Sequence, residues 1–413
     1  MEKTLFNNEI TGMKNYIMFE IKARQIELTP MLKAKDRAPI ALSMGAPVDR
    51  VPEFAIQKTT EHMQNDSLHT YSTPKGEVRF LEGVSTYMKN RFNVDVNPKN
   101  EVVSLIGSKE GLANLIRALV NPCDDPKEQD VIMLPTPGYA SYTQMVKIAK
   151  GRAYGIKLTK ENNYQPNLDE VLEQYIKEGN DPKKIKAIVI NYPNNPLGCT
   201  CEFSYLQHCV DFCNKHGILL ISDNAYCEMY YDEEYKPHSA LECKGAKDCC
   251  IEMYSFSKSY AMTGWRLGWA CGNELAVSML ARIKSTVDTG IFKVLQYVGA
   301  DLLESKEGQE YIDNQNIKFK NKIQKFVDGL NSLGYKIAMP KATFYLWLEI
   351  PERFKDCEEF ASEMLEKSGI VLVPGTAFDK DAKRYVRISV VDSDEKLAEV
   401  IRRMREDGFQ FEK

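Results

Sequence analysis

The sequence lacks an excess of basic residues. Its 413 residues carry 54 Lys and Arg against 58 Asp and Glu, which gives a formal net charge of -4. No long block of Lys or Arg and no basic arm stands out from this balance. Because proteins that bind nucleic acid usually present a basic patch or stripe, we expect no nucleic-acid partner.

Long apolar runs are missing as well. No stretch approaches the roughly 20 apolar residues that a membrane-spanning helix needs. The first residues, "MEKTLFNNEITGMKNYIMFEIKARQIEL", mix both charges and lack the basic-then-apolar layout of a signal peptide. The last residues, "DGFQFEK", carry no prenylation box. We therefore expect a cytoplasmic protein with no membrane partner.

Paired CxxC motifs are absent, although the chain has 11 cysteines. Without a secretion signal, we expect reduced thiols rather than disulfides. A cluster between Cys199 and His216 permits two interpretations, a zinc site or a helix over residues 203–215. The helical pattern buries Leu206, Cys209, Val210 and Cys213, with cysteine as a small hydrophobe. The spacing does not match a zinc finger, so we expect a helix and no metal.

The middle of the chain alternates short apolar runs with longer helical patterns. The runs "EVVSLIG", "DVIMLP", "KAIVINYP", "GILLISD" and "CCIEMYSF" are apolar at almost every position. Strands of this kind, separated by helices, predict an α/β domain whose mostly parallel sheet is covered by helices on both faces. From about residue 310 the pattern changes and predicts a smaller α+β domain. We place the boundaries at 1–60 for an N-terminal arm and part of the small domain, 61–309 for the large domain and 310–413 for the small C-terminal domain.

Polar residues follow each apolar run. In open parallel sheets, ligands bind beyond the carboxyl ends of the strands, so these residues are expected to share one edge. They are Gly107, Ser108, Lys109, Pro137, Gly138, Tyr139, Asn195, Pro196, Asp223, Tyr226, Ser255, Ser257 and Lys258.

Two sets of these residues could bind charged groups, one set an anion and the other a cation. The turn Gly107–Lys109, where a strand passes into a helix, offers backbone N–H groups to an anion, and Ser255, Ser257 and Arg266 add donors. The alternatives are an ordinary helix cap and a surface arginine. Asp223 ends an apolar strand, so a partly desolvated carboxylate there favours a cation such as a protonated ring nitrogen. Its alternative is a helix N-cap.

Lys258 lies between serines in "SFSKSY". A lysine held in a pocket beside cationic groups has a lowered pKa and can form a Schiff base. Tyr226 and Asn195 suit a phenolic oxygen, although one is equally a core residue and the other a turn residue. Pyridoxal 5'-phosphate needs this combination of phosphate donors, ring-nitrogen partner and lysine.

With these motifs the sequence resembles the fold-type I pyridoxal-phosphate aminotransferases of class I/II, the aspartate aminotransferase superfamily, from about Leu42 to the C-terminus. The matching segments are "SMGAPVD", "YSTPKGEVRFLEGVSTYM", "PTPGYASY", "NYPNNPLG", "SDNAY", "SFSKSYAMTGWRLG" and "RYVRISV". The resemblance implies catalytic roles for Lys258, Asp223 and Tyr226. It implies that the cofactor is bound by Tyr71, Gly107, Ser108, Lys109, Tyr139, Asn195, Asp223, Tyr226, Ser255, Ser257, Lys258 and Arg266, and the substrate by Gly45, Asn195 and Arg387.

The resemblance also implies partners and a reaction. Tyr71 is expected to reach the cofactor phosphate of a neighbouring subunit, which implies a homodimer with shared active sites. The reaction moves an α-amino group from an L-amino acid to a 2-oxo acid. The segments "SLIGSKEGL" and "VDTGIFKVLQ" are most similar to the LL-diaminopimelate branch, which implies 2-oxoglutarate as acceptor and a role in lysine biosynthesis.

Several alternatives stay open from the sequence. The segment "SMGAPVD" departs from the usual Gly-Asp-Pro of that branch and borders the substrate pocket, so aspartate, alanine and aromatic amino acids are further candidate substrates. A β-lyase on the same fold would carry the same residues. A non-catalytic binding or regulatory protein would not need to keep Lys258, Asp223, Arg266 and Arg387 together.

Overall fold

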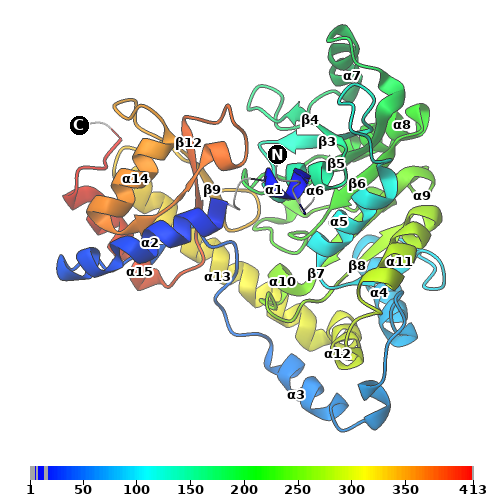
Figure 1. Ribbon diagram of the computed structural model, residues 1–413. Coiled ribbons are helices and arrows are strands. Elements are labelled where there is room, and N and C mark those ends of the chain that lie inside the picture. The colour runs from blue at the N-terminus through cyan, green and yellow to red at the C-terminus, as the bar shows by residue number, and fades with distance from the viewer. Residues whose placement is uncertain (1–4, 6–7, 14–16, 412–413) are drawn as a thin grey trace.

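The computed structural model describes residues 5, 8–13 and 17–411. Parts of both terminal sequences considered above, residues 1–4, 6–7, 14–16 and 412–413, lie outside the described residues. A large domain built on one wide sheet lies beside a smaller domain that contains the C-terminal helices (Figure 1). Within the described part of the chain, no helix has the length and apolar character needed to cross a membrane.

The large domain is organised around a seven-stranded sheet in the order β2-β8-β7-β6-β5-β3-β4. Its strands are β2 (Val102–Leu105), β3 (Val131–Thr136), β4 (Arg152–Lys157), β5 (Ile185–Ile190), β6 (Leu219–Asp223), β7 (Cys250–Ser255) and β8 (Gly268–Gly272). β8 runs antiparallel to both of its neighbours, while the strands from β7 to β4 pair in parallel. The prediction of a mostly parallel sheet is therefore confirmed.

Helices cover both faces of this sheet, and its central strands are therefore buried at almost every residue. One face packs on α5 (Ser108–Leu119), α6 (Ser141–Ile148) and α11 (Glu274–Val287). The other face packs on α4 (Val78–Phe92), α7 (Leu168–Lys177), α8 (Phe203–His216), α9 (Ala246–Cys249) and α12 (Lys293–Glu304). α3 (Glu53–His62) lies against α12. Short 3-10 turns span Asp66–His69, Pro182–Lys184, Glu233–Tyr235, Ala240–Glu242 and Gly375–Ala377.

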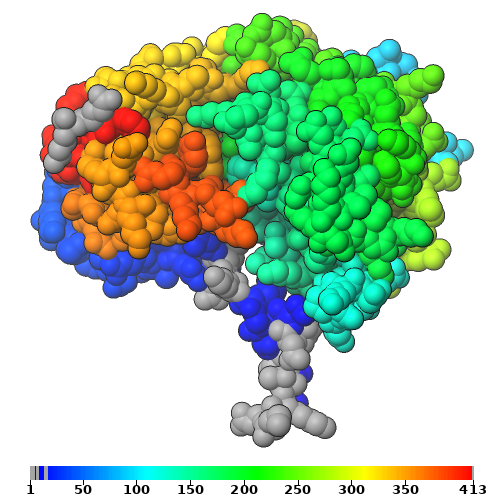
Figure 2. Space-filling model, turned by 90° about the horizontal axis from the view of Figure 1, so that it is seen from above, coloured from blue at the N-terminus to red at the C-terminus, as the bar shows by residue number. Residues whose placement is uncertain are grey.

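The small domain combines segments from both ends of the described chain. β9 (Tyr345–Glu349), β11 (Val373–Pro374) and β12 (Tyr385–Ser389) form an antiparallel sheet in the order β11-β12-β9. Its helices are α2 (Ile17–Ala34), α14 (Cys357–Ser368) and α15 (Asp394–Glu406), and β1 (Ile40–Ala41) pairs in parallel with β10 (Ile370–Val371). Figure 2 shows the blue N-terminal segment beside the orange and red C-terminal part. The smaller α+β domain is thus confirmed, and the boundaries at residues 60 and 309 stay predictions.

The long helix α13 spans the two domains, and the short helix α10 follows a strand of the large sheet. α13 (Lys306–Asn331) is long enough to reach both hydrophobic cores, with Ile312 in the large one and Phe319 in the small one. α10 (Phe256–Ser259) is a single turn that follows β7 directly. The short helix α1 (Asn8–Thr11) lies near α6.

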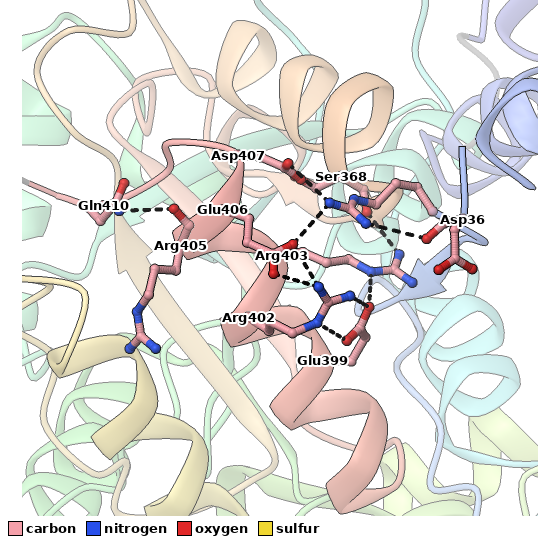
Figure 3. A network of polar contacts seen from close by, with 10 residues as sticks. Asp36, Ser368, Glu399, Arg402, Arg403, Arg405, Glu406, Asp407 and Gln410 are labelled. Carbon is pink, nitrogen blue, oxygen red and sulfur yellow. Dashed lines mark hydrogen bonds and ion pairs between the residues drawn. The ribbon is translucent and has the colours of Figure 1, made fainter. Parts of the chain in front are cut away.

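A polar network fastens the segment before β1 to the C-terminal helices (Figure 3). The buried guanidinium of Arg403 donates to the carbonyl oxygens of Ala38 and Ser368, each at 2.9 Å, and to Glu399 at 2.6 Å. Arg37 donates to Glu406 at 3.1 Å. β1 leads directly into residues 43–45, so this network holds the segment just before them.

Some elements were not predicted from the sequence. The edge strand β4 carries a mixture of charged and apolar residues, so it has no continuous apolar run. The helix α2 contains Pro30 and has buried and exposed apolar residues on several sides, so its periodicity is weak. Both are stabilised by tertiary contacts rather than by a pattern that local sequence carries.

We expect Arg403→Met to lower the free energy of unfolding by about 2 kcal/mol, because two buried carbonyl groups lose their donor. Arg402→Met is the matched control. The guanidinium of Arg402 contacts Glu399 and Glu406 at the surface, where ion pairs contribute little to stability. Urea unfolding of both variants measures the difference. Equal stability of the two variants would show that the network does not hold the segment.

Candidate active site

Every predicted site residue except Tyr71 lines one cavity of about 400 Å³. The cavity lies where the carboxyl ends of β2, β3, β5, β6 and β7 face β9 and β12 of the small domain. This position agrees with the rule for ligands of parallel sheets. The roles of the individual residues stay predictions, and the structure shows what each side chain contacts.

One end of the cavity is a cradle for an anion. Gly107 has φ +105° at the start of α5, and a Cβ atom there would lie 2.6 Å from Nη2 of Arg266. Arg266 donates to Oγ of Ser257 at 3.4 Å, and the hydroxyl of Ser255 accepts from the N–H of Ser257 at 3.2 Å. A guanidinium, serine hydroxyls and a helix N-terminus therefore surround a space that only glycine leaves open.

Asp223 ends β6 as a buried carboxylate. The hydroxyl of Tyr142 donates to its Oδ2 at 2.6 Å, and the N–H of Ala225 donates to Oδ1 at 3.4 Å. Burial raises the pKa of Asp223, and the hydrogen bonds and Lys258 only partly oppose this effect. A cationic N–H group in the cavity would stabilise the ionised carboxylate.

Lys258 extends from α10 into the same cavity. Its Nζ donates to the carbonyl oxygen of Gly45. Burial, followed by the positive charges of Arg387 and Arg266, lowers the pKa of Lys258 to about 8, and the negative charge of Asp223 opposes these effects. A large fraction of this amine is therefore neutral near pH 8, and a neutral amine can act as a nucleophile or a base.

Arg387 projects from β12 as a buried cation. Its Nη1 donates to Oδ1 of Asn195 at 3.1 Å and its Nη2 to the carbonyl oxygen of Ser43 at 2.8 Å. Its guanidinium carbon lies 4.4 Å from the ring centroid of Tyr345. Among the described residues no carboxylate pairs with Arg387, and its Nε has no hydrogen-bond partner there. Because a buried cation favours an anionic partner, this arrangement suits a carboxylate ligand.

Tyrosines join the two sides of the cavity. The hydroxyl groups of Tyr226 and Tyr345 lie 2.9 Å apart, and burial, followed by the neighbouring Tyr345, raises the pKa of Tyr226 well above its usual value. Tyr226 therefore stays a neutral hydroxyl that can donate a hydrogen bond into the cavity.

Tyr71 lies outside the cavity and is 88% exposed. It follows a 3-10 turn near α12, and its neighbour Ser72 accepts a hydrogen bond from Gln296 at 2.9 Å. Tyr71 therefore does not line the cavity of its own chain. Its predicted contact with a cofactor phosphate would need a second subunit.

Several cavity residues were not predicted, among them Tyr142, Asn191 and Tyr345. Asn191 donates to the carbonyl oxygen of Asp223 at 2.8 Å and accepts from the N–H of Asn195 at 3.0 Å, so it joins two strand ends. Tyr142 and Asn191 stand within quoted motifs, "PTPGYASY" and "NYPNNPLG", which was the available signal. Tyr345 carries no such signal, because its partners are far away in the sequence.

The cysteine cluster forms part of the core. The predicted helix is confirmed as α8, which ends at Gly217 with φ +63°, and Cys209 and Cys213 are fully buried on it. Burial raises the pKa of Cys209 to about 12, so its thiol stays protonated. Over the described ranges, no three His, Cys, Asp or Glu side chains come together in a way that could hold a metal ion.

The chain is similar to aminotransferases along almost its whole length. A family model described as aminotransferase class I and II matches residues 37–404. LL-diaminopimelate aminotransferase 2 of Nostoc sp. is 36% identical over 98% of this chain and 99% of its own. The LL-diaminopimelate aminotransferase of Moorella thermoacetica is 36% identical over 89% of this chain and 90% of its own.

Solved structures share the fold of this chain. The substrate-bound structure of BacF from Bacillus subtilis has a TM-score of 0.90 at 29% identity and covers 100% of both chains. The structure of Thermus thermophilus aspartate aminotransferase with maleate has a TM-score of 0.86 at 24% identity and covers 97% of this chain and 99% of its own, which shows the shared fold.

We expect Gly107→Ala to weaken binding of pyridoxal phosphate by at least about 10-fold, because its Cβ atom would displace the guanidinium of Arg266. Fluorescence titration of the protein with pyridoxal phosphate measures this. Gly179→Ala is the matched control: it also has positive φ, at +84°, but its Cβ would meet nothing within 4 Å. If both variants bound as the unmodified protein does, the cradle would not hold the phosphate.

Proposed function

Because the chain belongs to the class I and II aminotransferases, we propose that it transfers an amino group from LL-diaminopimelate to 2-oxoglutarate. Transfer of an α-amino group to a 2-oxo acid is the activity of this enzyme family, and its members depend on pyridoxal phosphate. The donor is supported by curated relatives that carry this activity in their names and match nearly the whole chain. An enzyme with this donor serves lysine biosynthesis.

Pyridoxal phosphate fits the residues that line the cavity. The cradle at Gly107 and Arg266 would hold the phosphate, Asp223 would face the ring nitrogen, and Tyr226 and Asn195 would donate to the ring oxygen. The buried Asp223 supports this placement, since burial raises the pKa of its carboxyl group and a pyridinium N–H group would stabilise the ionised form. When bound, the cofactor carries the amino group between substrates and draws electrons from the substrate's Cα.

The side chains of this chain would divide the work as follows. Arg387 binds the α-carboxylate of the amino acid and thereby points its Cα toward Lys258. The neutral amine of Lys258 accepts the proton from Cα, and its lowered pKa keeps enough of it neutral to do so near pH 8. Because Lys258 is held within the cavity, this proton transfer needs no diffusing base.

We further propose a homodimer in which Tyr71 of each chain reaches the phosphate cradle of the other. The exposure of Tyr71 supports this, because a tyrosine that is 88% exposed in one chain is available to a second chain. The biosynthetic reaction named for the relatives supports a cytoplasmic location.

The donor can be identified with the purified protein loaded with pyridoxal phosphate. LL-diaminopimelate, glutamate, aspartate, alanine and phenylalanine are added one at a time while the visible absorbance is recorded. We expect LL-diaminopimelate to change the absorbance and to give kcat/KM at least roughly 100-fold above aspartate and alanine. Lys258→Ala is the control, and it should bind substrate without turnover.

Other outcomes of that experiment separate the alternatives. Preference for aspartate, alanine or phenylalanine would keep the aminotransferase and contradict the donor. A thioether amino acid is added as a sixth compound, and release of pyruvate and ammonia from it would favour the β-lyase. A protein that does not bind the cofactor would favour a non-catalytic role.

We expect Arg387→Met to raise KM for every amino acid and 2-oxo acid by roughly 100-fold, because the α-carboxylate loses a buried charged partner. Steady-state kinetics with donor and acceptor varied in turn measure this. Arg384→Met is the control, since Arg384 donates to the carbonyl oxygens of Phe354 and Ile350 and does not line the cavity. An unchanged KM in Arg387→Met would exclude the carboxylate role.

A further inference from the structure

The helix α13 passes from one domain to the other beside the candidate active site. Ile312 belongs to the core of the large domain and Phe319 to the core of the small domain. Gln315 lies between them and is buried, at 5% exposure. A buried amide at this crossing is unusual, because the neighbouring inward positions of the helix are apolar.

The amide of Gln315 contacts the main chain of the predicted catalytic lysine. Its Nε2 donates to the carbonyl oxygen of Lys258 at 3.1 Å and to that of Ser259 at 3.3 Å. These carbonyl groups end α10, a helix of one turn, and the last carbonyl groups of a helix have no partner within it. Gln315 therefore caps the turn that carries Lys258.

The next residue holds the neighbouring loop. Nδ2 of Asn316 donates to the carbonyl oxygen of Glu228 at 2.7 Å, two residues after Tyr226. The carboxylate of Glu228 is itself buried and accepts from Arg91 at 3.1 Å. Two consecutive amides on α13 thus bind the loops that carry Lys258 and Tyr226.

This arrangement leaves two buried oxygen atoms unsatisfied. Oε1 of Gln315 and Oδ1 of Asn316 have no hydrogen-bond donor among the residues that the structure describes. An unpaired buried oxygen destabilises a protein, whereas an apolar side chain of the same length would avoid that loss. The amide at position 315 is thus better explained by the carbonyl groups of Lys258 and Ser259 that it binds than by its contribution to stability alone.

We propose that Gln315 is a positioning residue, which keeps the Lys258 amine inside the cavity by fixing the backbone of its turn from the interdomain helix. The inference rests on the proposed function of Lys258. Without the cap, the turn can move away from Arg387 and Arg266 and the amine can reach water. The causes that lower the pKa of Lys258, first its burial and then these two arginines, would then weaken.

The first test reads the amine directly, without cofactor and without turnover. Protein free of cofactor is treated with formaldehyde and cyanoborohydride at a series of pH values, and methylation of Lys258 is measured by peptide mass spectrometry. In the unmodified protein the rate should reach half its maximum near pH 8. We expect Gln315→Met to move this midpoint upward by roughly one pH unit, toward the ordinary lysine value.

Gln324→Met is the matched control. It removes the same amide from the same helix, but Gln324 is exposed and its Nε2 contacts Asp328 at 2.9 Å, one turn along. We expect the midpoint of this variant to equal that of the unmodified protein. If Gln315→Met does not fold, Gln315→Asn replaces it, because the shorter amide keeps the polarity and cannot reach both carbonyl groups.

The second test separates binding from chemistry in the loaded enzyme. A displaced base slows proton transfer and leaves the carboxylate contact intact, so we expect kcat to fall by about 10-fold to 100-fold while KM changes less than about threefold. A lowered melting temperature with an unchanged methylation midpoint and an unchanged kcat would overturn the proposal and assign Gln315 a structural role. Failure of the proposed role of Lys258 would differ, since Lys258→Ala would then turn over as the unmodified protein does.

Discussion

Positive charge without matching negative charge is the constraint around which this site is built. Among the described residues that line the cavity, the buried Arg387, the half-buried Lys258 and the more exposed Arg266 accompany the single carboxylate of Asp223. Cations brought together under reduced solvation repel one another and favour anionic ligands. A phosphate at Arg266 and a carboxylate at Arg387 would balance them. The lowered pKa of Lys258 follows from the same imbalance, after the effect of burial itself.

The polypeptide partly compensates for this charge with main-chain oxygen atoms. The segment 43–45 provides the carbonyl of Ser43 to Arg387 and the carbonyl of Gly45 to Lys258. That segment follows β1, which is paired with β10 and anchored by the Arg403 network. Lys258 of the large domain and Arg387 of the small domain thus both contact one short stretch of backbone. A shift between the domains would change both of these hydrogen bonds together.

The sequence contained most of the cofactor side of the site, because β2, β3, β5, β6 and β7 are apolar runs with the site residues following them. Local pattern was sufficient for Gly107, Asn195, Asp223 and Lys258, which lie at such strand ends. It was not sufficient where a side chain from a remote segment completes the site. Tyr142 lies 81 residues from Asp223, Tyr345 lies 119 residues from Tyr226, and Gln315 lies 57 residues from Lys258. Periodicity predicts which face of an element is buried, but it does not identify the partner.

Binding of LL-diaminopimelate needs polar groups at both ends of the substrate, and one side of this cavity is apolar. LL-diaminopimelate has a second ammonium and a second carboxylate, and both need polar partners at the far end of the pocket. On the side of Gly45 the cavity is lined by Met18, Met44 and Ala46, which are apolar. Polar partners on this side would therefore come from outside the lining described for one chain. A second subunit that brings Tyr71 to the phosphate would bring its neighbouring segments as well, so the proposed dimer and the proposed donor depend on each other. A monomeric enzyme with this lining would select a smaller or less polar amino acid.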